Sequence, residues 1–124
     1  MKTILVVDDN LEFKEMMSDY FKDAGYTVET AENGKDGIAK ARTVKPDIIF
    51  LDVMMPDIGG IEVLRELQGY EETAGIPIMV ITGTYFDKNM YELFKIESNC
   101  REFISKTTEL AVIQKKMEAI IGKA

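Results

Sequence analysis

Short apolar runs alternate with longer amphipathic segments along this chain. Residues 4–7, 48–51 and 77–81 are continuously apolar, a pattern typical of strands that are buried on both faces of a parallel sheet. Residues 26–31 alternate between apolar and polar side chains and predict an outer strand, and residues 103–105 predict a short fifth strand. We therefore expect these segments to form one sheet.

Each of these runs is followed by a segment whose apolar residues share one face of an α-helix. The spacing predicts helices within residues 13–24, 38–44, 61–67, 90–94 and 110–121. A strand followed by a helix, repeated along the whole chain, is typical of an α/β fold. In such a fold, helices cover both faces of a mostly parallel sheet.

Composition limits the functions that this fold can carry. The 124 residues suit a single domain, 1–124, and include no histidine and one cysteine. Nucleophile–histidine pairs, imidazole metal sites and internal disulfides are therefore excluded, and a reducing, cytoplasmic compartment is expected. The net charge of −7 and the absence of a long apolar run argue against direct binding to nucleic acid and against a membrane location.

Polar residues stand where four of the predicted strands end. Asp8 and Asp9 follow the first strand, and Asp52, Thr82 and Lys106 end the third, fourth and fifth. Because ligands of open parallel sheets bind at the carboxyl ends of strands, these side chains are expected to meet at one edge. Each also has an ordinary explanation, such as a helix N-cap for Asp9, a turn for Asp52 and a solvated charge for Lys106.

Together these residues favour a phosphoryl-transfer site. Clustered carboxylates repel one another unless a cation offsets their charge, and donors without His or Cys favour a hard cation such as Mg²⁺ or Mn²⁺. One carboxylate could attack phosphorus and give an aspartyl phosphate. Lys106 and the Thr82 hydroxyl would contact the same phosphoryl group, so that positioning and electrostatics carry the transfer.

Four segments resemble, in order and spacing, the receiver domain of two-component response regulators. They are residues 6–10 (VVDDN), 51–57 (LDVMMPD), 81–83 (ITG) and 103–106 (FISK). The resemblance covers essentially the whole chain, and its specificity lies in the combination of motifs. It implies a flavodoxin-like, doubly wound sheet of five parallel strands in the order 2-1-3-4-5. It also implies a stand-alone, chemotaxis-regulator-like receiver with no output domain.

The resemblance implies a phosphoacceptor and a metal site. Asp52 would accept the phosphoryl group, in a chain that is a signalling phosphoacceptor and promotes only its own phosphorylation and dephosphorylation. Mg²⁺ or Mn²⁺ would be bound by Asp9, Asp52 and the backbone carbonyl of Met54, while Asp8 would act mainly through water.

The resemblance also implies a switch and protein partners. Thr82 and Lys106 would contact the phosphoryl group, and the Phe103 ring would turn inward when Thr82 moves. The donor would be a phosphohistidine on a sensor histidine kinase or phosphotransfer protein. A changed helix 4–strand 5–helix 5 surface would signal to a downstream protein that the sequence does not identify, and a homodimer on activation is compatible with this family.

The chain departs from the family pattern near the fifth strand. Thr107 follows Lys106 where the family usually has a proline after a cis bond, so either a strained peptide or a different loop is expected. Phe103 replaces the commoner tyrosine and lacks its hydroxyl. Residues 97–102 replace a stretch that usually carries Gly-Ala, so the signalling surface is expected to be individual.

Three other functions compete with this interpretation. The first is an interaction module on the same fold that never uses phosphate. The second is a haloacid-dehalogenase-like phosphatase, which needs a second Asp two residues after the nucleophile, where this chain has Met54. The third is a flavin binder, which would need a Ser/Thr-rich phosphate loop after the first strand in place of Asp8 and Asp9.

Overall fold

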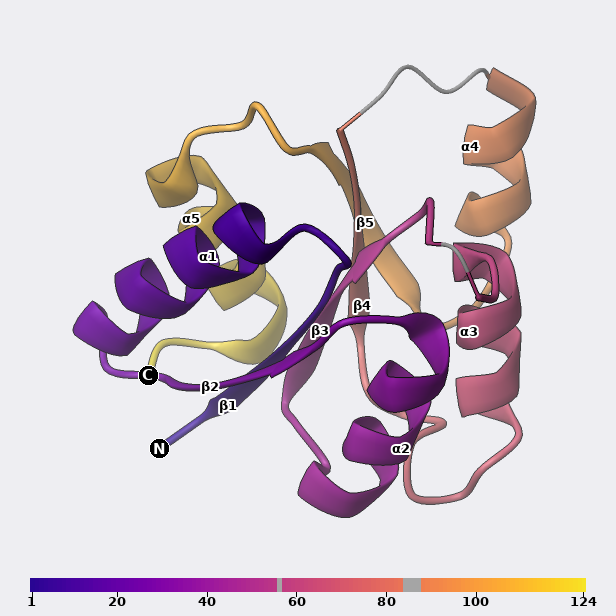
Figure 1. Cartoon of the computed structure of the whole chain (residues 1–124), viewed down its shortest axis with the longest axis horizontal. Coiled ribbons are helices and arrows are strands. Elements are labelled where there is room, and N and C mark those ends of the chain that lie inside the picture. The colour runs from indigo at the N-terminus through magenta and orange to yellow at the C-terminus, as the bar shows by residue number, and fades with distance from the viewer. Residues whose placement is uncertain (56, 84–87) are drawn as a thin grey trace.

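The computed structural model describes residues 1–55, 57–83 and 88–124. Within them, strands alternate with helices in the expected order (Figure 1). The elements are β1 (Thr3–Val7), α1 (Leu11–Asp23), β2 (Thr27–Ala31), α2 (Gly34–Val44), β3 (Ile48–Asp52), α3 (Gly60–Gln68), β4 (Ile78–Thr82), α4 (Lys88–Lys95), β5 (Cys100–Ser105) and α5 (Leu110–Ile121). The strands are parallel and lie in the order β2-β1-β3-β4-β5, which confirms the flavodoxin-like fold.

The three central strands are the continuously apolar runs of the sequence. Every residue of β3 and of β4 is buried, as is all of β1 after Thr3. Their register pairs Val7 with Leu51 and Asp52 with Ile81. The carboxyl ends of β1, β3 and β4 therefore lie level with one another at one edge of the sheet.

Helices cover both faces of the sheet and divide the core in two (Figure 1). On one face α1 and α5 pack over a cluster that includes Phe13, Met17, Phe21, Ile113 and Met117. On the other face α2, α3 and α4 pack over a second cluster that includes Ile38, Ala41, Val63, Leu64, Leu67 and Phe94. Because each strand alternates its side chains between the two faces, both halves of the core are filled by the same apolar runs.

The fifth strand is longer than its apolar pattern indicates. It begins at Cys100 and not at Phe103, and its pairing with β4 shifts register between Ile78 and Met79, which lie opposite Cys100 and Glu102. β5 is an edge strand, and one side of such a strand faces solvent. Polar residues are tolerated there, so a search for apolar runs misses the start of the strand.

The N-cap of the first helix tests the ordinary explanation of Asp9. The side chain of Asn10 accepts a hydrogen bond from the backbone N–H of Phe13 at 2.8 Å and is the N-cap of α1. The N-cap explanation of Asp9 is therefore wrong. The helices of the described residues include none that is long and apolar enough to span a membrane.

Candidate functional site

The carboxyl ends of two neighbouring strands bring three aspartates together. Asp52 is the last residue of β3, and Asp8 and Asp9 follow the end of β1 beside it. One carboxylate oxygen from each of the three lies within 4.8 Å of the other two. Asp8 and Asp52 are buried and Asp9 is exposed. The structure thus gathers the three acids that the strand ends predicted.

Lys106 faces this cluster from the end of β5. Its Nζ lies 2.7 Å from Asp8 Oδ2 and 3.8 Å from Asp52 Oδ2. The same Nζ lies 4.8 Å from the ring centroid of Phe13, at the start of α1, where the ring face attracts a cation. A single positive charge therefore lies beside two buried carboxylates, and the cluster keeps an excess of negative charge.

The two oxygens of Asp8 have different surroundings. Oδ1 accepts a hydrogen bond from the backbone N–H of Asn10 at 2.8 Å. Oδ2 is buried and receives no aligned hydrogen bond from the described residues, so its polar contact is the ion pair with Lys106. An all-oxygen donor set with one incompletely satisfied carboxylate fits a hard divalent cation with its bound waters.

The surroundings of Asp52 disfavour its charge. Its pKa is raised from 3.8 to about 6, first by burial and then by the neighbouring Asp8 carboxylate. Lys106 and the backbone N–H of Met54 act in the opposite direction but do not outweigh these causes. A cation bound beside Asp52 would favour the ionised, nucleophilic form of the carboxylate.

Met54 lies at the rim of the cluster. Its backbone N–H points to Asp52 Oδ1 across 3.4 Å, so the chain folds back toward the carboxylate directly after β3. The side chain is 63% exposed. Only the backbone of Met54 is therefore turned to the site, and its side chain lies at the surface beside it.

Thr82 and Lys106 are held together by the pairing of β4 with β5. Thr82 is buried and lies opposite Ser105, and its carbonyl accepts a hydrogen bond from the backbone N–H of Lys106 at 2.8 Å. The described residues contain no cis peptide bond, so the Lys106–Thr107 bond is trans. In place of a cis proline turn, Thr107 N–H donates to Ser105 Oγ at 3.1 Å and the two hydroxyls lie 2.8 Å apart.

Phe103 connects β5 with α4. Its ring is half-buried and makes edge contacts with Tyr91 and Phe94, at centroid distances of 5.7 and 5.6 Å. Phe94 belongs to the apolar stripe of the predicted helix, whereas the pattern gave no sign of Tyr91. A movement of the Phe103 ring would therefore change its packing against α4 directly.

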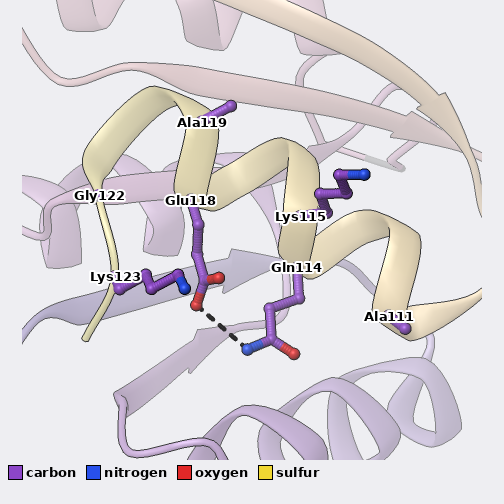
Figure 2. Close-up of a pocket in the computed structure, with 7 residues that line it drawn as sticks. All are labelled: Ala111, Gln114, Lys115, Glu118, Ala119, Gly122 and Lys123. Carbon is purple, nitrogen blue, oxygen red and sulfur yellow. Dashed lines mark hydrogen bonds between the residues drawn. The ribbon is translucent and has the colours of Figure 1, made fainter.

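A separate hollow of about 490 Å³ runs along α5, away from the aspartates. Figure 2 shows its lining, with Gln114 Nε2 donating to the Glu118 carboxylate at 3.1 Å. None of the clustered carboxylates reaches it, so it is not part of the site at the strand ends. The lining residues are Ala111, Gln114, Lys115, Glu118, Ala119, Gly122 and Lys123.

Comparisons with known proteins agree with this geometry. Residues 4–118 match the family model of the response regulator receiver domain. The chain is 30% identical to protein PilH of Pseudomonas aeruginosa, over 98% of this chain and 99% of that protein. It is 31% identical to the alkaline phosphatase synthesis transcriptional regulatory protein PhoP of Bacillus subtilis, over 99% of this chain and 50% of that protein.

The fold is also that of a solved chemotaxis protein. The structure of CheY4 of Vibrio cholerae superimposes with a TM-score of 0.89 and 28% identity, over 97% of this chain and 98% of that one. Family, fold and the acidic cluster at the strand ends therefore agree, and this chain belongs to the response regulator receiver domain family of two-component signalling.

Proposed function

We propose that this receiver domain accepts a phosphoryl group on Asp52 from a phosphohistidine of a sensor histidine kinase or phosphotransfer protein. The observation that carries the proposal is the cluster of Asp8, Asp9 and Asp52, with Lys106 Nζ against two of the three. The 124 residues contain no histidine, so the donor phosphohistidine lies outside them. Such an exchange belongs in the cytoplasm, where these kinases present their phosphohistidine.

The metal site uses oxygen donors from two neighbouring strand ends. Asp9, Asp52 and the backbone carbonyl of Met54 would hold Mg²⁺ or Mn²⁺, and Asp8 would act through a bound water. When bound, the ion supplies positive charge that offsets the phosphoryl oxygens. Support comes from the mutual proximity of the three carboxylates and from the incompletely satisfied Asp8 Oδ2.

The protein groups then carry the transfer. A carboxylate oxygen of Asp52 forms a bond to phosphorus while the P–N bond of the donor breaks, and the imidazole stays on the donor protein. Lys106 Nζ, which already lies 3.8 Å from Asp52 Oδ2, pairs with the phosphoryl oxygens. The Thr82 hydroxyl donates to the same group.

The signal leaves through β5 and α4. Thr82 shifts toward the phosphoryl group, and the ring of Phe103 follows it inward. Because that ring packs on Tyr91 and Phe94, the shift changes the surface that α4, β5 and α5 offer to a downstream protein. A phosphorylation-dependent change of amide hydrogen exchange at Tyr91 and Phe103, absent in Asp52→Asn, is the expected result.

Acetyl phosphate with Mg²⁺ tests the phosphoacceptor. Intact-mass measurement is expected to show one added phosphoryl group in the wild type, and none in Asp52→Asn or after chelation of the metal. Asp36→Asn, which removes a carboxylate that is not part of the cluster, serves as the matched control and should be labelled normally. Labelling of Asp52→Asn would overturn the assignment. A wild type that binds Mg²⁺ but never takes label would favour the phosphate-independent interaction module.

A further inference from the structure

Asp57, in the loop between β3 and α3, binds the N-terminus of α2. Its Oδ1 accepts a hydrogen bond from Gly34 N–H at 3.0 Å, and its Oδ2 accepts one from Lys35 N–H at 2.8 Å. The first N–H groups of a helix lack partners within the helix, and the positive end of its dipole favours a carboxylate. Although burial opposes it, the pKa of Asp57 is lowered by these amide bonds. Both oxygens thus tie the loop to α2.

Side-chain packing also connects the β3–α3 loop with the N-terminus of α2. Gly34 is buried at the start of α2, directly against Ile58 of the loop and Val63 of α3. A Cβ placed on Gly34 would lie 2.5 Å from Ile58 Cγ1 and 3.0 Å from Val63 Cγ2, too close for a side chain. The loop therefore rests on the helix at a position that only glycine leaves open.

The loop is also fixed at its two ends. Val53 N–H donates to Ile81 O of β4 at 3.2 Å, and Gly60 N–H donates back to Val53 O at 3.2 Å. Asp57 is a third attachment, between these two. Along the chain, Met54 lies between the phosphoacceptor end of β3 and this third attachment.

We propose that Asp57 is a positioning residue for the metal site, an inference that rests on the proposed function. Its hydrogen bonds to α2 hold the loop so that the Met54 backbone presents its carbonyl as a metal ligand. Asp57 does not itself touch the ion and acts through the loop backbone. A role limited to capping α2 would change stability and leave Mg²⁺ affinity untouched, which separates the two roles experimentally.

Asp57→Ala removes both attachments and is tested by calorimetric titration with Mg²⁺. The affinity is expected to fall about tenfold, as for other groups that orient metal ligands. Labelling by acetyl phosphate should need correspondingly more Mg²⁺, whereas the rate at saturating Mg²⁺ should stay within about twofold of the wild type. Asp57→Asn keeps one acceptor oxygen, so its Mg²⁺ affinity should lie between those of the wild type and Asp57→Ala. If Asp57→Ala does not fold, the test is made with Asp57→Asn.

Asn33→Ala is the matched control at the same end of α2. The Asn33 side chain accepts a hydrogen bond from Asp36 N–H at 2.8 Å, so this cap lies within α2 itself. Its loss should lower the melting temperature and leave the Mg²⁺ affinity unchanged. Gly34→Ala, which pushes Ile58 away with Asp57 intact, should weaken Mg²⁺ binding by a second route.

Two results would overturn the positioning role alone: an unchanged Mg²⁺ affinity in the Asp57 variants, or an equal loss of affinity in Asn33→Ala. In both cases the wild type would still bind Mg²⁺ and take label on Asp52, so the proposed function would stand. A wild-type protein that neither binds Mg²⁺ nor takes label would overturn both proposals.

Discussion

Asp52 is a buried carboxylate whose charge is costly to the folded protein. Its pKa is about 6 in the fold against 3.8 for the free side chain. Below the lower value the group is protonated in both states and costs nothing. As the pH rises from the lower to the higher value, the unfolded chain ionises before the folded state and the folded state loses stability; above the higher value the cost is complete and stays constant at neutral pH.

Asp52→Asn should therefore stabilise the metal-free protein at neutral pH and not in acid. The gain in free energy of unfolding is expected to be on the order of 1–3 kcal/mol at about pH 7.5 and close to zero at about pH 4. Urea unfolding at the two pH values measures it. Asp9→Asn removes an exposed charge of the same cluster and should gain less; an equal gain for Asp52→Asn at both pH values would contradict the raised pKa.

Lys106 is the counter-ion of a fully buried Asp8. Lys106→Met keeps most of the side-chain volume but leaves the Asp8 charge unpaired, so the metal-free protein should lose about 3–5 kcal/mol of unfolding free energy. Mg²⁺ should restore more stability to this variant than to the wild type, because it can take over the neutralising role. Lys115→Met, on the exposed face of α5, should change neither quantity. Equal Mg²⁺ responses in Lys106→Met and the wild type would show that Lys106 does not neutralise the metal site.

At the scale of the element, the start of α1 depends on one side chain. Asn10 caps the helix and Asp9 does not, although both residue types favour that position. Asn10→Ala should lower the free energy of unfolding by about 1 kcal/mol. Asp9→Ala should leave stability almost unchanged and weaken Mg²⁺ binding instead. Thermal melts with and without Mg²⁺ distinguish the two, and a reversal of the pattern would refute the cap assignment.

The strands that the sequence predicted best are those buried on both faces. β3 and β4 are buried on both faces and are apolar up to their last residues, Asp52 and Thr82, so run and strand nearly coincide. β5 is an edge strand, where Arg101 and Glu102 can face water, and its start was therefore missed. The choice between Asp9 and Asn10 depends on a bend of the chain after β1 that neither propensity nor spacing encodes.

The acids of the site could be found from the sequence because each stands directly at a strand end. Parallel topology alone then brings Asp8, Asp9 and Asp52 together. The attachment of Asp57 to Gly34 could not be found in this way, since the two residues are separated by 23 positions and neither lies in a strand. Contacts between a loop and a helix end need the packed structure.

At the scale of the whole molecule, the proposed metal binding would be linked to folding. The three carboxylates come together only in the fold, so Mg²⁺ should bind the folded protein and not the unfolded chain. At a free concentration one hundred times its dissociation constant, the ion should add about 2.7 kcal/mol to the stability. For a domain of this size the melting temperature should rise by roughly 10 °C, measured by calorimetry.

NaCl at the same ionic strength is the control for the Mg²⁺ experiment. It should raise the melting temperature far less than Mg²⁺ does. Asp52→Asn should lose most of the Mg²⁺ effect because it removes one carboxylate ligand. An equal rise with NaCl would indicate general screening of the net charge of −7 in place of a specific site.

The two edges of the sheet carry charges in the middle of their strands. β2 has Glu29, and β5 has Arg101 and Glu102. Charged side chains on an edge strand hinder another chain from extending the sheet, which is how natural sheets resist aggregation. Neither edge is therefore a template for cross-β assembly. Edge-to-edge pairing of two copies into one continuous sheet is therefore disfavoured at both ends of the sheet.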